Sequence, residues 1–121
     1  LVSSQASNQV LEYDAATGAF LGVVASVPWP IGLLLDPAGN LLVSSYSTSC
    51  VLRFAPDGTP MGAFVPSGSA GLNLSQGLAW APNGNLLVVS TGTNCVMEFS
   101  GTDGSLMEEY DRVWVLYDEA R

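Results

Sequence analysis

The stretch GLLLDPAGNLLVSSYSTSCVLRF, residues 32–54, decides the fold because it returns 45 residues later as GLAWAPNGNLLVVSTGTNCVMEF, residues 77–99. Thirteen of the 23 ungapped positions are identical in the two copies. A partial third copy opens the chain, where LVSSQASNQVLEY, residues 1–13, aligns with LVSSYSTSCVLRF, residues 42–54. A repeat period in the forties with four short strand-like segments per unit predicts the blades of an all-β propeller.

Each full repeat predicts four antiparallel strands, a to d in chain order, separated by turns rich in Pro, Asp, Asn and Gly. The first repeat lacks strand a, so its strands b to d are expected at residues 1–4, 9–13 and 20–24. The second repeat predicts strands at residues 31–35, 40–45, 50–54 and 61–65, and the third at 76–81, 85–90, 95–99 and 105–110. We therefore expect one propeller segment over residues 1–121, with repeats at 1–24, 31–65 and 76–110 and an acidic C-terminal strand or tail at 111–121.

Fewer than three whole repeats are present, whereas a closed ring needs about 4 to 8 blades. We therefore expect a fragment, a processed product or one subunit of a larger ring. The apolar segment VWVLY, residues 113–117, has the character of a strand a. It is predicted to pair with residues 1–4 of another copy or with neighbouring sequence, and two copies joined head to tail would make six blades.

The composition argues against two classes of partner. The chain has three Arg, no Lys and a net charge of −8, so nucleic acid is not expected to bind. The longest apolar stretch, residues 23–35, is interrupted by two Pro residues and falls short of a membrane-spanning helix. Seven of the eleven acids lie in the last 24 residues, where they form either a solvated face or a docking surface for a basic partner.

Cys50 and Cys95 occupy the same position in successive repeats, so they are expected to be too far apart for a disulfide and to remain free and buried. Trp80 is expected to be buried near the inner edge of its blade. One further repeated position of strand c carries charged residues and is expected on a less buried side, without functional weight: Glu12, Arg53 and Glu98.

The repeats resemble those of the NHL-repeat propellers and of the related streptogramin-lyase-like and SMP-30-like families. The shared features are an opening Gly, a Pro-x-Gly-Asn turn, an apolar strand and a polar loop, found here at Gly32, 36–40, 41–43 and 45–49 and again at Gly77, 82–85, 86–89 and 90–94. This resemblance implies a β-propeller and leaves the function open, because such propellers serve as enzymes, receptors and scaffolds.

The chain departs from these families at functional positions. Many NHL repeats begin strand c with Arg, where this chain has Gln9, Cys50 and Cys95. Streptogramin lyases depend on a catalytic His, and this sequence has no His. SMP-30-like lactonases hold a divalent metal with carboxylates, whereas Asp36 is the only acid in a strand-a region here, at its turn end.

Catalytic chemistry has few candidate residues in this chain. No His or Lys is available as a base for a nucleophilic Ser. Glu108 and Glu109 alternate along a strand and so point to opposite faces. The Gly-rich run at residues 67–71 precedes a strand and has no Lys, which favours an inter-blade connector over a phosphate site. We therefore expect no enzyme activity, no cofactor and no metal within this chain.

The b–c loops and the d–a connections emerge on one side of a propeller, where short polar side chains lie beside an aromatic residue. These could bind a polar ligand or a protein loop. The candidate binding residues are Ser4, Asn8, Trp29, Tyr46, Thr48, Thr91 and Asn94. The alternative is that the hydroxyl and amide groups only satisfy nearby backbone groups in turns.

The leading hypothesis is a non-catalytic propeller module for interaction or structure, which contacts protein partners or further blades in a homo-oligomer or a larger complex. The alternatives are a fragment of a lyase- or lactonase-type propeller enzyme with catalytic residues outside this chain, and a glycan-binding propeller. The compartment is open, with an extracellular or luminal location favoured over the nucleus.

Overall fold

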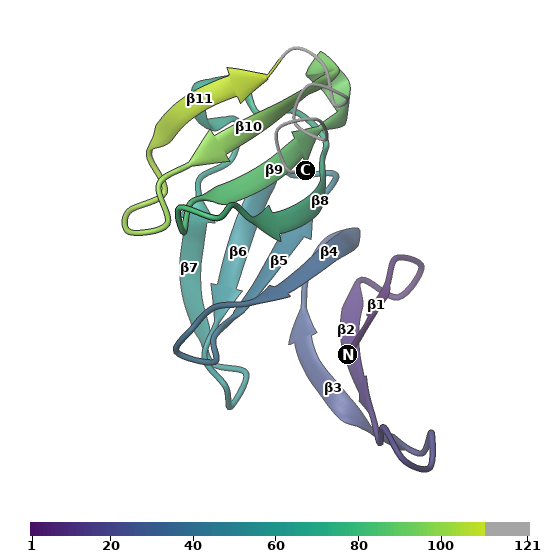
Figure 1. The fold of residues 1–121 in the computed structure, drawn as a ribbon. Helices are drawn as coiled ribbons and strands as arrows, with labels where there is room; N and C mark the ends of the chain where they lie inside the picture. The colour runs from purple at the N-terminus through teal and green to yellow at the C-terminus, as the bar shows by residue number, and fades with distance from the viewer. Residues whose placement is uncertain (111–121) are drawn as a thin grey trace.

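The computed structural model of the chain describes residues 1–110, and it consists of three antiparallel sheets, one from each repeat (Figure 1). The first sheet contains β1 (Val2–Ser4), β2 (Gln9–Tyr13) and β3 (Phe20–Ser26). The second contains β4 (Pro30–Leu35), β5 (Leu41–Ser45), β6 (Cys50–Phe54) and β7 (Pro60–Val65). The third contains β8 (Ser75–Trp80), β9 (Leu86–Ser90), β10 (Cys95–Phe99) and β11 (Leu106–Tyr110), and two 3-10 turns lie at Ser69–Gly71 (η1) and Thr91–Thr93 (η2).

The sheets have the meander order of propeller blades, β1-β2-β3, β4-β5-β6-β7 and β8-β9-β10-β11, and are called blades 1, 2 and 3 below. Every strand expected in residues 1–110 is present, with ends that differ by at most two residues. The all-β, partial-propeller prediction is therefore confirmed. The strand expected at residues 113–117, and its pairing, lie outside the described residues.

The turns of the blades follow from their sequence chemistry. In the turn between β4 and β5, the Asp36 carboxylate accepts hydrogen bonds from the backbone N–H groups of Ala38 at 2.9 Å and Asn40 at 2.8 Å. Gly39 lies in the same turn at φ +85°, a left-handed conformation that glycine adopts at little cost. The Asp-Pro-Ala-Gly-Asn segment thereby reverses the chain over a few residues.

The apolar cores lie between the blades, because each blade packs its faces against its neighbours. In β5, Leu41 and Val43 belong to the core between blades 1 and 2, while Leu42 belongs to the core between blades 2 and 3. All five residues of β5 are buried, and its apolar run at residues 41–43 is typical of a strand covered on both faces. Burial of this kind is the main stabilising contribution to the stack.

Serine hydroxyl groups join neighbouring blades at their inner edges. Ser3 Oγ donates to the carbonyl of Ile31 at 2.9 Å, which links β1 to β4. Ser44 occupies the equivalent position in blade 2, where its Oγ accepts from Gly32 N at 2.8 Å and donates to the carbonyl of Gln76. A Cβ on Gly32 would lie 2.6 Å from the Gln76 oxygen, so glycine permits this close approach.

Two of the burial expectations need correction, and one is confirmed. Trp80 is half-buried rather than buried, because its ring packs on the edge of a core and its Nε1 donates to the Leu35 carbonyl at 2.9 Å. Glu98 is only 7% exposed, against the expectation of a less buried side, because neighbouring polar side chains solvate its carboxylate. Cys50 and Cys95 are both free and buried, as predicted.

Candidate functional site

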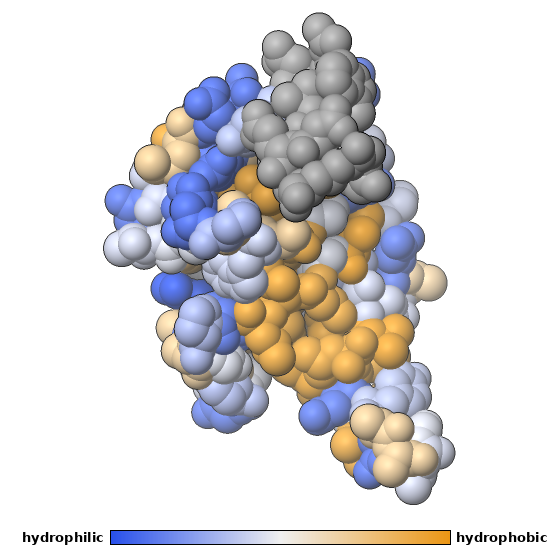
Figure 2. All heavy atoms as spheres, viewed as in Figure 1, coloured by the Kyte–Doolittle hydropathy of each residue, from blue (hydrophilic) through white to orange (hydrophobic). Residues whose placement is uncertain are grey.

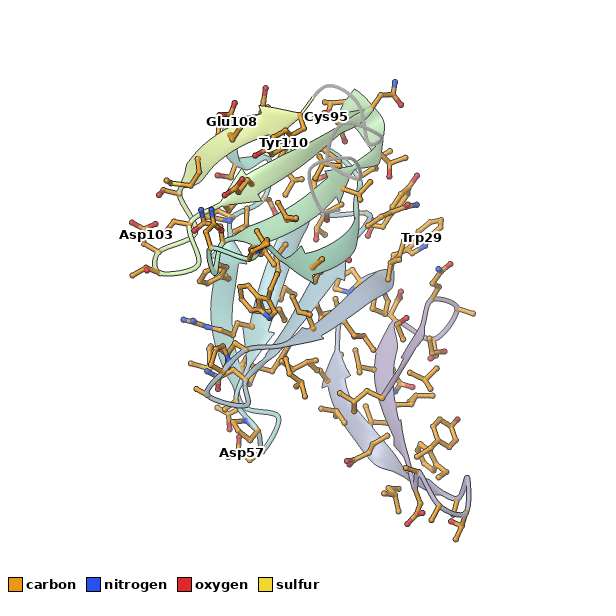
Figure 3. The ribbon with its side chains drawn as sticks, viewed as in Figure 1. Trp29, Asp57, Cys95, Asp103, Glu108 and Tyr110 are labelled. Atoms are coloured by element: carbon orange, nitrogen blue, oxygen red, sulfur yellow. The ribbon has the colours of Figure 1, made fainter. Side chains whose placement is uncertain are left out.

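Asn8, Trp29 and Tyr46 come together from three separate segments. Trp29 N donates to Asn8 Oδ1 at 2.9 Å, and the Trp29 carbonyl accepts from Tyr46 N at 3.0 Å. The Trp29 and Tyr46 rings lie 5.2 Å apart at an interplanar angle of 39°. Trp29 is 46% exposed and projects from the start of β4 beside the loop of blade 1 (Figure 3). Exposed Trp29 and half-buried Tyr46 thus form an aromatic pair at the surface, held in place by hydrogen bonds of their backbone N–H groups.

Thr48 is committed to its own loop. Its Oγ1 donates to Ser45 Oγ at 2.6 Å and lies 3.2 Å from Cys50 Sγ. Thr93 repeats this arrangement in blade 3, at 2.6 Å from Ser90 Oγ. Hydroxyl groups at this position therefore stabilise the loop, as the local-satisfaction alternative predicts.

The other three candidate residues lie apart from the aromatic pair. Ser4 Oγ accepts from Ser7 Oγ at 2.7 Å on blade 1. On blade 3, Thr91 N donates to the Leu74 carbonyl at 3.1 Å, while Thr91 Oγ1 is buried with no hydrogen-bond partner within residues 1–110. Asn94 is exposed, and among residues 1–110 neither Asn94 nor Thr91 makes a hydrogen bond or ring contact with Trp29.

The last residue of the b–c loop connects one blade to the next in blades 1 and 2. Asn8, Ser49 and Asn94 end the three b–c loops in the left-handed region, at φ values of 55°, 55° and 53°. Asn8 Oδ1 accepts from Trp29 N, and Ser49 Oγ accepts from Leu74 N at 2.9 Å, so each fixes the start of the following blade. Sequence reasoning missed Ser49, although the Asn, Ser, Asn pattern at equivalent positions was a usable signal.

The Glu98 carboxylate accepts three side-chain hydrogen bonds. Its Oε2 accepts from Asn85 Nδ2 at 2.7 Å and from Asn83 Nδ2 at 3.1 Å, and its Oε1 accepts from Tyr110 OH at 2.8 Å. The hydrogen bonds from Asn85 and Asn83, opposed by burial, hold the pKa of Glu98 below its ordinary value. A carboxylate with its oxygens so occupied acts as a structural anion.

A cavity of about 440 Å³ lies between blades 2 and 3 at their a–b turns. Its polar groups are Arg53 and Asp36, and Phe64, Trp80 and Pro82 supply apolar walls. Sequence reasoning did not find this cavity, because it forms only where two blades meet. Within residues 1–110, no group of three or more His, Cys, Asp or Glu could hold a metal ion, and no helix could cross a membrane.

Solved structures similar to this chain are β-propeller proteins. A streptogramin B lyase matches with a TM-score of 0.67 and 16% identity over 88% of this chain and 34% of its own. A catalytically inactive variant of virginiamycin B lyase from Staphylococcus aureus, solved with quinupristin, matches with a TM-score of 0.68 and 14% identity over 90% and 36%. A Bacteroides caccae protein of unknown function matches with a TM-score of 0.64 and 19% identity over 84% and 37%.

These similarities establish the fold alone, because the identities are low. The chain spans between 34% and 37% of the length of these proteins. No protein-family model matches the sequence, and no curated protein matches it. The chain therefore has an all-β, partial β-propeller fold, which is similar to the fold of these solved structures.

Proposed function

We propose that this chain is a non-catalytic β-propeller module that mediates protein–protein contacts within a larger assembly. The observation that carries the proposal is an apolar face of blade 1. Val2, Leu11 and Val23 are paired across β1, β2 and β3, so their side chains share one face. Val10 lies on the opposite face, in the core against blade 2.

The same face is buried in the other two blades. Tyr13 is 40% exposed, whereas Phe54 and Phe99, at the equivalent positions, are 5% and 0% exposed. Val2 is 49% exposed, whereas the equivalent Val43 in blade 2 is 0% exposed. In blades 2 and 3 these positions pack against the preceding blade, so among residues 1–110 no other blade covers the equivalent surface of blade 1.

The surrounding side chains extend this apolar surface. Phe20 is 57% exposed and stacks edge-on against Tyr13, with ring centroids 5.5 Å apart. Figure 2 shows further apolar side chains gathered over β4 and the first sheet. Large exposed apolar areas mark protein interaction sites in soluble proteins. The partner that this surface fits is the face of another blade, and a second copy of this chain is the available source.

The test is the oligomeric state of the intact chain, measured by sedimentation velocity over a range of concentrations. The wild-type chain is expected to self-associate, and Tyr13→Asp is expected to shift it toward monomer by placing a charge in the docking surface. Met61→Asp is the control, because Met61 is 45% exposed on the outer strand β7 of blade 2. A wild-type chain that stays monomeric at every concentration, or an equal response to both substitutions, contradicts the proposal.

A further inference from the structure

The cavity between blades 2 and 3 contains the only positively charged side chain of residues 1–110, that of Arg53. The Arg53 Nε is buried and has no hydrogen-bond partner in this part of the chain. The guanidinium carbon lies 5.2 Å from the ring centroid of Phe64, a cation–π contact. This contact does not replace a hydrogen-bond acceptor for the Arg53 N–H groups. A buried donor without an acceptor costs free energy. The cavity therefore has room for a ligand oxygen that would accept a hydrogen bond from Arg53 Nε.

The position of Arg53 in blade 2 is occupied by Glu98 in blade 3, where the charged group has hydrogen-bond partners. The Glu98 carboxylate accepts hydrogen bonds from Asn83 and Asn85, which lie in the a–b turn of the same blade. In blade 2 the corresponding turn residues are Ala38 and Asn40. Ala38 has no polar side-chain group, and Asn40 Nδ2 donates to Asp36 Oδ2 at 3.0 Å instead.

The apolar walls of the cavity indicate which kind of ligand it could hold besides an acceptor for Arg53. Trp80, Phe64 and Leu42 line it with aromatic and aliphatic surface, and Pro37 and Pro82 lie on the two turns that border it. The volume of about 440 Å³ lies within the range of small-molecule sites, roughly 300 to 1,000 Å³. A planar apolar body fits these walls, and an anionic group at one end would meet Arg53.

Asp36 limits the charge that this ligand can carry. Burial opposes its ionisation, but hydrogen bonds from Asn40 and Ala38 and the nearby positive charge of Arg53 leave the pKa of Asp36 below its ordinary value. The cavity therefore contains a fixed negative charge beside its one cation. Arg53 and Asp36 balance each other, so a dianion such as a phosphate monoester would add twice the negative charge of a single carboxylate and be repelled more strongly by Asp36.

We propose that the cavity between blades 2 and 3 binds a small aromatic monocarboxylate, with its carboxylate on the Arg53 guanidinium and its ring against Trp80 and Phe64. The site is separate from the docking surface of blade 1. Binding here bridges two blades and is independent of whether the chain self-associates.

The test compares the binding of three phenyl compounds that differ in charge to the intact chain: benzoate, benzamide and phenyl phosphate. Binding is followed by the indole N–H signal of Trp80 in two-dimensional NMR, up to about 10 mM ligand, the affinity range of molecules this small. Benzoate is expected to shift the Trp80 signal saturably. Neutral benzamide and dianionic phenyl phosphate are each expected to bind about tenfold more weakly or worse.

Arg53→Gln is expected to raise the Kd for benzoate about tenfold or more, and Arg53→Lys to raise it less, because Lys retains the charge without the planar fork. Glu12→Gln, at the equivalent position of blade 1, is the control and should leave the Kd unchanged. The three probes are compared on the wild-type chain, so the result does not depend on how well the variants fold. No saturable binding of benzoate, equal binding of benzoate and benzamide, or tighter binding of phenyl phosphate overturns the proposal.

Discussion

Glu98→Gln separates the charge of Glu98 from its shape. Both Asn83 and Asn85 donate to Oε2, so a Gln with its carbonyl oxygen in that place keeps both bonds, now to a neutral acceptor. The Gln amide then meets the Tyr110 hydroxyl, which can turn to accept. Charged hydrogen bonds contribute ~1.5–3 kcal/mol and neutral ones ~0.5–1.5, so three weakened bonds correspond to a loss of about 2 kcal/mol, allowing for non-additivity.

The pH dependence identifies the cause of that loss. The pKa of Glu98 is lowered from 4.5 in the folded chain, so its stabilising contribution is complete above that value and disappears as the pH falls through the folded pKa. Protonated Glu98 resembles Gln, and the two proteins should then unfold alike. The other carboxylates with lowered pKa values, Asp14, Asp36, Asp57 and Asp103, are shared by both proteins and cancel in the difference.

Urea unfolding followed by circular dichroism measures the effect. At about pH 7 the midpoint of Glu98→Gln should fall by roughly 1 M urea, because an m value near 2 kcal/mol/M converts the expected loss. At about pH 3 the two midpoints should converge. Glu12→Gln, an exposed residue at the equivalent position of blade 1, should change the free energy of unfolding by less than ~0.5 kcal/mol. A difference for Glu98→Gln that is equally large at both pH values would refute the charge-based account.

Two further predictions concern packing between and within the blades. Gly104→Ala places a Cβ against the carbonyl oxygen of Phe64 and should destabilise the chain by at least ~1 kcal/mol more than Gly18→Ala, because both glycines have φ +75° but Gly18 has open space around it. Equal thermal shifts for the two variants would count against the clash. Cys50 and Cys95 are 3% and 8% exposed, so a thiol reagent should label both in unreduced, denatured protein and neither quickly in the native chain. Rapid native labelling would show that the blades open readily.

The repeat was sufficient to predict the three sheets, because turn residues such as Gly39 and the apolar runs of β5 and β9 are local signals. Contacts between blades were harder to predict from the sequence. Arg53 and Glu98 occupy one repeated position, but their surroundings depend on turn residues of the blade and on the next blade, which strand patterns do not specify. A charged residue in a strand also predicts exposure, and at Glu98 the Asn and Tyr donors reverse that expectation.

The candidate loop surface was predicted in part. An aromatic residue among short polar ones indicated a surface, and the structure places Trp29 beside Tyr46 and Asn8 there. Thr48 could not be separated from a binding residue by sequence alone, because a hydroxyl that satisfies its own loop has the same residue type as one that faces a ligand.

The two cores between the blades are unequal, and this has a kinetic consequence. Six buried residues form the core between blades 1 and 2, whereas ten form the core between blades 2 and 3. In a stack stabilised by nearest-neighbour interfaces, the end with the smaller interface opens most often. Amide hydrogens of β1 and β2 should therefore exchange with solvent before those of β6 and β9, and limited proteolysis of the described chain should begin in the loops of its first sheet.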